Sequence, residues 1–154
     1  MVMGKYFLAL LAALLLTTGV AFAQETKKAY LLDSFQGDIA AGKTIEVQAP
    51  EKISWESYGA ISFWLQGAGT GAKIAVDVED DEGEFHRFMV TDDTRERKQA
   101  VCPFDAFFPR AYGQPIMTEP NGEIDFPIKS LRFELMTRAT GPVLIDQVSL
   151  EALN

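Results

Sequence analysis

The chain has 154 residues, of which 47% are hydrophobic, and its formal net charge at pH 7 is −8. Because contact with nucleic-acid phosphates requires clustered Lys and Arg side chains, this acidic balance argues against nucleic-acid binding. The sequence also lacks the polybasic segment that anionic lipid surfaces attract. Cys102 is the only cysteine, which excludes an intramolecular disulfide, and its apolar neighbours predict a buried thiol.

The first residues have the features of a secretory signal peptide. Lys5 supplies a positive charge, an apolar run follows at 7–16, and Ala-Phe-Ala at 21–23 places small residues before a cleavage point. The apolar run is too short to span a bilayer comfortably, and an uncleaved anchor is the alternative. We therefore predict a signal peptide at 1–23 and a single domain at 24–154. This domain would be secreted or periplasmic, with no membrane contact after cleavage.

The remainder of the chain is predicted to form short strands. Apolar and polar residues alternate most clearly at 60–66 and 73–79, which is typical of strands with one buried face. No window shows a sustained helical period. Regular Gly, Pro and Asp turns between such strands predict an all-β fold, an antiparallel β-sandwich of the jelly-roll type. We expect the last two strands to pair across the turn at 138–142. The strands are expected at 30–34, 44–49, 60–66, 73–79, 84–90, 98–103, 130–136 and 143–150.

Charged residues gather at two of the expected turns. One group of acidic residues lies around a hairpin, where a metal or sugar-hydroxyl site is one interpretation and a solvated sheet edge is the one we favour. A second charged segment, 91–98, is predicted to be a solvated loop. His86 is the only histidine, and its inward-facing neighbours predict a hydrogen-bonded structural role. The acidic group comprises Asp77, Glu79, Asp80, Asp81, Glu82 and Glu84.

Three segments resemble parts of a known family. Leu-Leu-Asp-Ser-Phe at 31–35 is similar to its opening strand, and Ile-Ser-Phe-Trp-Leu-Gln-Gly at 61–67 is similar to its first long core strand. The segment 103–150 resembles its end. The family is carbohydrate-binding module family 11, the β-glucan-binding jelly roll, with relatives in the CIA30 family and the wider galactose-binding-like fold. The resemblance implies a non-catalytic module that binds a poly- or oligosaccharide. The alternative is a CIA30-like protein-interaction or assembly module with no sugar ligand.

The same resemblance implies the residues of a sugar-binding cleft. Arg110 occupies the position of an arginine that lines the family's cleft, and Tyr112 and Gln114 follow it closely. Glu82 corresponds to an acidic cleft residue. A guanidinium offers a fork of donors to sugar hydroxyls, and an aromatic ring can stack on the apolar face of a pyranose. Trp64 is a further stacking candidate, although packing between the sheets is an equally good interpretation of this residue.

The chain departs from the family between its opening and core strands. Only residues 36–58 fill this interval, where the family has extra strands that carry cleft tyrosines. The tyrosine of the family's penultimate strand falls at Leu135 here. Trp55 and Tyr58 are therefore candidates to replace the missing rings. No nucleophile–base pair or metal-ligand cluster of recognisable spacing is present, so we predict no enzymatic activity.

The resemblance finally implies a candidate structural Ca²⁺ site. In these jelly rolls the two terminal strands pair, and acidic residues on them often hold calcium. The corresponding residues here are Asp33 and Asp146. Calcium requires six to eight oxygen ligands, which carboxylates and nearby carbonyls can supply. The alternative is that both carboxylates accept hydrogen bonds at the end of the sheet.

Overall fold

The structure is a computed structural model that describes residues 30–38, 44–49, 53–116, 120–137, 139 and 141–152. The signal peptide predicted at 1–23 lies outside the described residues. Among the residues described, no helix is both long enough and apolar enough to cross a membrane. The elements are β1 (Tyr30–Asp38), β2 (Thr44–Gln48), η1 (Trp55–Ser57), β3 (Tyr58–Gln66), β4 (Lys73–Glu79), β5 (Phe85–Thr91), β6 (Lys98–Pro103), η2 (Phe104–Ala106), β7 (Phe108–Pro109), β8 (Ser130–Leu135) and β9 (Leu144–Ala152).

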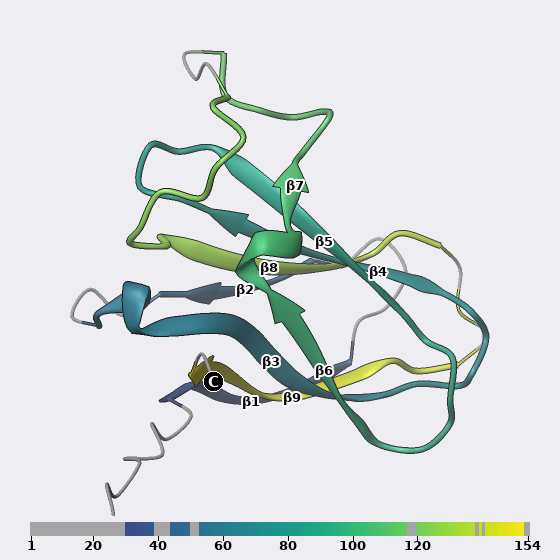
Figure 1. Cartoon of the computed structure of the whole chain (residues 1–154). Coiled ribbons are helices and arrows are strands. Elements are labelled where there is room, and N and C mark those ends of the chain that lie inside the picture. Colours follow the sequence, from purple (N-terminus) through teal and green to yellow (C-terminus); the bar gives the residue numbers. More distant parts are fainter. Residues whose placement is uncertain are drawn as a thin grey trace, which may run out of the picture.

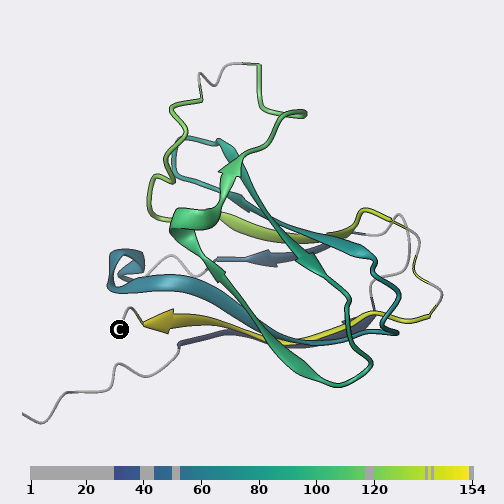
Figure 2. The same ribbon diagram turned by 45° about the vertical axis from the view of Figure 1, so that its right-hand side comes forward.

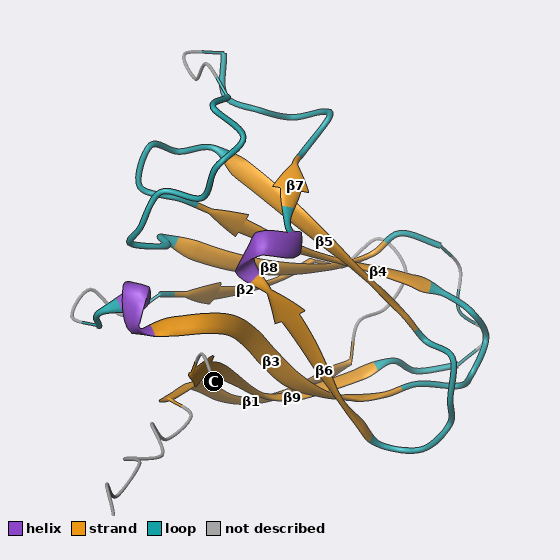
Figure 3. Cartoon of the chain, viewed as in Figure 1, coloured by secondary structure: helices purple, strands orange, loops and turns teal. Residues whose placement is uncertain are grey.

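Two antiparallel sheets pack face to face (Figures 1 and 2). One has the strand order β1-β9-β3-β6, and the other has the order β2-β8-β4-β5-β7. Strands dominate the described chain, and the two helical turns η1 and η2 lie at one end of the sandwich (Figure 3). The predicted antiparallel β-sandwich is therefore confirmed. The terminal strands pair as the resemblance implied, with β9 between β1 and β3.

The expected pairing of the last two strands is wrong. β8 lies between β2 and β4 in the five-stranded sheet, whereas β9 lies in the four-stranded sheet. Each strand has one apolar face, with Leu131 and Phe133 on β8 and Ile145 and Val148 on β9. Because both faces bury against the same core from opposite layers, the turn between the two strands must cross from one sheet to the other.

Apolar side chains from the two inner faces fill the space between the sheets. Within this core, the ring of Phe63 on β3 packs edge to face against the ring of Phe133 on β8, with 4.9 Å between the ring centroids. Cys102 is buried as predicted, and burial raises the pKa of its thiol to about 12. Trp55 is also buried, at 1% exposed, and packs against Phe126 at a centroid distance of 6.5 Å. The expectation that Trp55 replaces a sugar-stacking ring is therefore wrong.

The segment 91–98 is not simply a solvated loop, because Asp92 within it is buried. Its carboxylate accepts hydrogen bonds from the backbone N–H groups of Ala68, Gly69 and Thr70 at 3.0 to 3.2 Å. The Thr70 hydroxyl donates a fourth hydrogen bond at 3.0 Å. Burial alone would raise the pKa of Asp92, but the four donors together hold it below its ordinary value. The ionised carboxylate thus fixes the turn between β3 and β4.

We expect replacement of Asp92 by asparagine to lower the free energy of unfolding by about 2 kcal/mol at pH 7, because an amide oxygen accepts these hydrogen bonds more weakly than a carboxylate. The folded-state pKa of Asp92 lies below the unfolded value. Its contribution is therefore complete above the unfolded pKa and is lost as pH falls through the folded pKa. Urea unfolding at pH 7, 4 and 3 measures this, and the difference from the unmodified chain should shrink at acidic pH. Asp93→Asn is the matched control, since that side chain is exposed and its ion pair, to Lys98, is the one that the described part of the chain gives it. If Asp92→Asn loses the same free energy of unfolding at all three pH values, the ionised Asp92 carboxylate is not what stabilises this turn.

Candidate functional site

A row of alternating charges crosses the solvent face of the five-stranded sheet. Glu46 on β2 lies opposite Arg132 on β8, Arg132 lies opposite Asp77 on β4, and Asp77 lies opposite Arg87 on β5. We refer to these four residues as the charged row. Opposite charges at directly facing positions of an antiparallel sheet attract one another. The Arg132 guanidinium contacts the Glu46 carboxylate at 3.1 Å and also lies 5.7 Å from the ring centroid of Phe85.

Asp77 is the centre of this row. Its side chain is only 1% exposed although it points to the outer face, because arginine side chains cover it. Arg87 binds it with two hydrogen bonds, from Nε to Oδ1 at 2.6 Å and from Nη2 to Oδ2 at 2.7 Å. The hydrogen bond to Asp77 is the main cause that raises the pKa of Arg87, and Glu134, whose Oε2 accepts from Nη2 at 3.2 Å, adds to it. Nη1 of Arg110 lies 3.6 Å from the same Oδ2 of Asp77.

A short loop after β7 brings Arg110 to this face. The Arg110 N–H donates to the carbonyl of Phe85 at 2.8 Å. The Gln114 amide binds both backbone groups of Phe85, accepting from its N–H at 2.8 Å and donating to its carbonyl at 2.6 Å. Gly113, with φ of 79°, turns the chain in the left-handed region that favours glycine. The loop is thereby fastened to β5, and Tyr112 at its tip is 85% exposed.

The structure brings together part of the site that the sequence predicted. Arg110, Tyr112 and Gln114 share one loop, but the Gln114 amide is occupied by backbone groups, which assigns it a positioning role. Glu82 is exposed on the turn between β4 and β5, at the end of the same sheet. Trp64 lies on β3 in the opposite, four-stranded sheet, where the Arg97 guanidinium sits 4.3 Å from its ring centroid. Trp64 therefore does not share a surface with Arg110.

The two positions that relate to the family's missing rings also lie away from this face. Tyr58 begins β3 in the four-stranded sheet. Leu135 ends β8 and is buried toward the core. Neither side chain therefore adds an aromatic ring beside Arg110.

Sequence reasoning missed the partners of Arg110. The period-two pattern placed Asp77 on the outer face of its strand, but the acidic residues around the hairpin were interpreted as a solvated edge. That interpretation is wrong for Asp77, Asp80 and Glu84, each of which is buried. Arg87 and Arg132 were not singled out, because only the strand register reveals that they flank Asp77. A pattern of opposite charges at outward positions of neighbouring strands was the available signal.

The calcium hypothesis stays a prediction. Asp146 on β9 forms an ion pair with Arg97, with 2.9 Å between Oδ2 and Nη2. In the backbone register Asp146 faces Gln36, and Asp33 faces Val148. The side chain of Asp33 lies outside the described residues. A cation at Asp146 would have to compete with the Arg97 guanidinium for the same carboxylate.

The family model of carbohydrate binding domain family 11 matches residues 37–153. The chain belongs to this family. Among solved structures, a family 11 carbohydrate-binding module from Clostridium thermocellum in complex with a β-1,3-1,4-mixed-linked tetrasaccharide matches with a TM-score of 0.62 and 17% identity, covering 80% of this chain and 95% of that one. The family 11 module of the cellulosomal cellulase Lic26A-Cel5E of the same organism matches with a TM-score of 0.59 and 19% identity, covering 82% and 95%. No curated protein sequence matches the chain.

The family 11 resemblance found in the sequence is therefore confirmed. The structural likeness, at identities below 20%, shows that the family 11 module has the same sandwich fold. The family model supports carbohydrate binding as the function of the chain, and the CIA30-like alternative is not favoured.

Proposed function

We propose that this family 11 module is a non-catalytic, exported protein that binds a poly- or oligosaccharide on the outer face of its five-stranded sheet. The single observation that carries this proposal is the placement of Arg110 beside the charged row. Its side chain is 24% exposed, and among the described residues its guanidinium has one ion-pair contact, to Asp77 at 3.6 Å. N–H donors therefore remain to point at a ligand in solvent. The signal peptide predicted at 1–23 supports export.

A neutral polysaccharide suits this face better than a charged one. Glu46 pairs with Arg132, and Asp77 and Glu134 pair with Arg87, so the charges compensate one another within the sheet. What remains for a ligand is a polar surface of fixed donors and acceptors, which hydroxyl groups can bind. The exposed ring of Tyr112 adds an apolar surface on which a pyranose can stack.

Mixed-linked β-glucan is the first ligand to test. One of the matched structures is described as a complex with a β-1,3-1,4-mixed-linked tetrasaccharide. We propose the same class of neutral glucan for this chain, bound across the strands near Arg110. A protein partner would favour a continuous apolar patch of several hundred Å², and the charged row on the proposed face differs from such a patch.

We expect Arg110→Ala to weaken binding of a mixed-linked β-glucan tetrasaccharide by about tenfold or more, because a hydrogen bond to a charged donor contributes about 1.5–3 kcal/mol. Isothermal titration calorimetry measures the affinity. Arg97→Ala is the matched control, since Arg97 lies over Trp64 on the opposite sheet, and it should leave binding unchanged. Equal affinity of Arg110→Ala and the unmodified chain would reject this face, and binding lost in the control alone would move the site to Trp64.

A further inference from the structure

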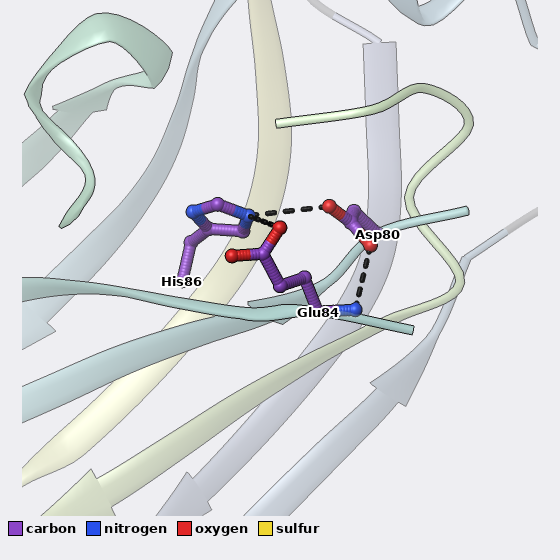
Figure 4. A group of neighbouring side chains, drawn as sticks. All are labelled: Asp80, Glu84 and His86. Carbon is purple, nitrogen blue, oxygen red and sulfur yellow. Dashed lines mark hydrogen bonds and ion pairs between the residues drawn. The ribbon is translucent and has the colours of Figure 1, made fainter. Parts of the chain in front are cut away.

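A buried triad of Asp80, Glu84 and His86 lies at the end of the β4–β5 hairpin (Figure 4). Both carboxylate side chains are 0% exposed, and the imidazole is 1% exposed. His86 Nε2 faces both acids, at 3.2 Å from Asp80 Oδ2 and 3.9 Å from Glu84 Oε2. One donor atom from each of the three side chains can be chosen so that all lie within 4.8 Å of one another. The hydrogen-bonded histidine predicted from the sequence is confirmed, but its partners were not predicted.

The triad carries an unmet electrostatic requirement. Glu84 Oε1 is buried and has no hydrogen-bond partner among the described residues. The only ion pairs that the described residues give Asp80 and Glu84 are those with His86. Burial of two ionised carboxylates against one imidazole is unfavourable unless a proton or another positive charge compensates them, because the low-dielectric interior does not screen the repulsion between them. A divalent cation between the three side chains would supply that charge.

We propose that the buried triad binds a divalent transition-metal ion, for which Zn²⁺ is the best candidate. Ligands at 2.0–2.1 Å from a tetrahedral ion lie about 3.4 Å from one another, close to the separations of His86 Nε2 from the two carboxylates. Imidazole and carboxylate together suit Zn²⁺, whereas calcium sites use six to eight oxygens. The site is separate from the calcium site predicted at Asp33 and Asp146.

The ion would stabilise the structure beneath the proposed sugar-binding face. Glu84 and His86 point inward, and the residues between and after them, Phe85 and Arg87, point outward to that face. Backbone N–H groups of the segment before β8 also reach the triad, from Asn121 to Glu84 Oε2 at 3.1 Å and from Asp125 to Asp80 Oδ2 at 3.4 Å. The metal would fix the two carboxylates that accept these hydrogen bonds, and so stabilise the place where the segment at 121–125 meets the hairpin end.

Because His86 is the only histidine, its ring reports metal binding directly. The chain is purified without a histidine tag, stripped with EDTA, and refolded from urea with and without one equivalent of Zn²⁺, so that slow entry cannot hide binding. We expect Zn²⁺ to shift the ¹⁵N resonance of His86 Nε2, to bind with a stoichiometry of one, and to raise Tm by roughly 5–10 °C at 100-fold excess over Kd. Unchanged His86 resonances after refolding with Zn²⁺ would overturn the proposal.

An isosteric pair of variants separates this site from adventitious binding. Glu84→Gln should weaken Zn²⁺ binding at least tenfold, while Glu82→Gln, on the exposed part of the same turn, should bind as the unmodified chain does. Equal Zn²⁺ affinity in both variants would reject the triad. If Glu84→Gln does not fold, the His86 resonances of the unmodified chain decide the question alone. Uptake of Ca²⁺ but not Zn²⁺, without a shift at His86, would also reject it and would support Asp33 and Asp146 instead. None of these readouts depends on sugar binding.

Discussion

Replacement of Asp77 by alanine is expected to lower the free energy of unfolding by on the order of 3 kcal/mol, because it breaks a buried ion pair by removing one partner. Asp77 is 1% exposed and accepts two hydrogen bonds from Arg87. Without it, the guanidiniums of Arg87 and Arg110 would both lose the buried carboxylate that they contact. The loss therefore exceeds that of a surface pair, whose contribution is usually below 1 kcal/mol.

The same substitution should weaken sugar binding at least tenfold, since Arg110 would lose the contact that directs its side chain. Urea unfolding measures the first effect and isothermal titration calorimetry with mixed-linked β-glucan tetrasaccharide measures the second. Glu134→Ala is the control, because Glu134 contacts the same Arg87 through one hydrogen bond and is 34% exposed. It should cost less than about 1 kcal/mol. If Asp77→Ala proves no more destabilising than Glu134→Ala, the charged row is a solvated surface and not the organised site proposed here.

The strands were predictable from the sequence because each of them buries one face. The expected bounds agree with those of β4 at Lys73–Glu79 and β6 at Lys98–Pro103, and the other predicted strands were placed within a few residues. β7 was not predicted, since its two residues are too few to show any period. The alternation gives no information on which strand pairs with which. That is why β8 and β9 were predicted to pair with each other, although they belong to different sheets.

The candidate site was harder to predict because its acidic residues acquire their partners from distant parts of the chain. Asp80 and Glu84 appear in the sequence as members of a charged turn, yet backbone groups of Asn121 and Asp125 cover them. Asp77 alternates correctly to the outer face, but Arg87 and Arg110 remove it from solvent. The local alternation of apolar and polar residues predicts the face to which a side chain points. Only the tertiary structure decides whether a side chain on that face is exposed to solvent. The loop with Arg110 and Tyr112 was predicted through the family resemblance.

Truncation of Phe63 to alanine is expected to cost about 4 kcal/mol of unfolding free energy, as is typical of large-to-small changes in a packed core. Phe63 and Phe133 are each 0% exposed, and their rings meet edge to face at 4.9 Å between centroids. One ring comes from each sheet, so the contact joins the two layers. Phe133→Ala should cost a similar amount, and urea unfolding measures both. Val101→Ala on β6 is the control, since that side chain is 49% exposed and should change the stability little.

The double variant tests whether this contact, and not burial alone, couples the sheets. If the ring pair interacts specifically, the two losses should fall short of additivity by about 1 kcal/mol, because the second truncation removes a contact already lost. Full additivity would mean that each ring contributes only its own buried area. The proposed sugar-binding face lies on the outer side of the sheet that Phe133 supports, and Arg132 and Glu134 flank Phe133 in sequence and point to that face. Weaker coupling between the sheets should therefore also loosen the charged row, and glucan affinity should fall in Phe133→Ala more than in Phe63→Ala.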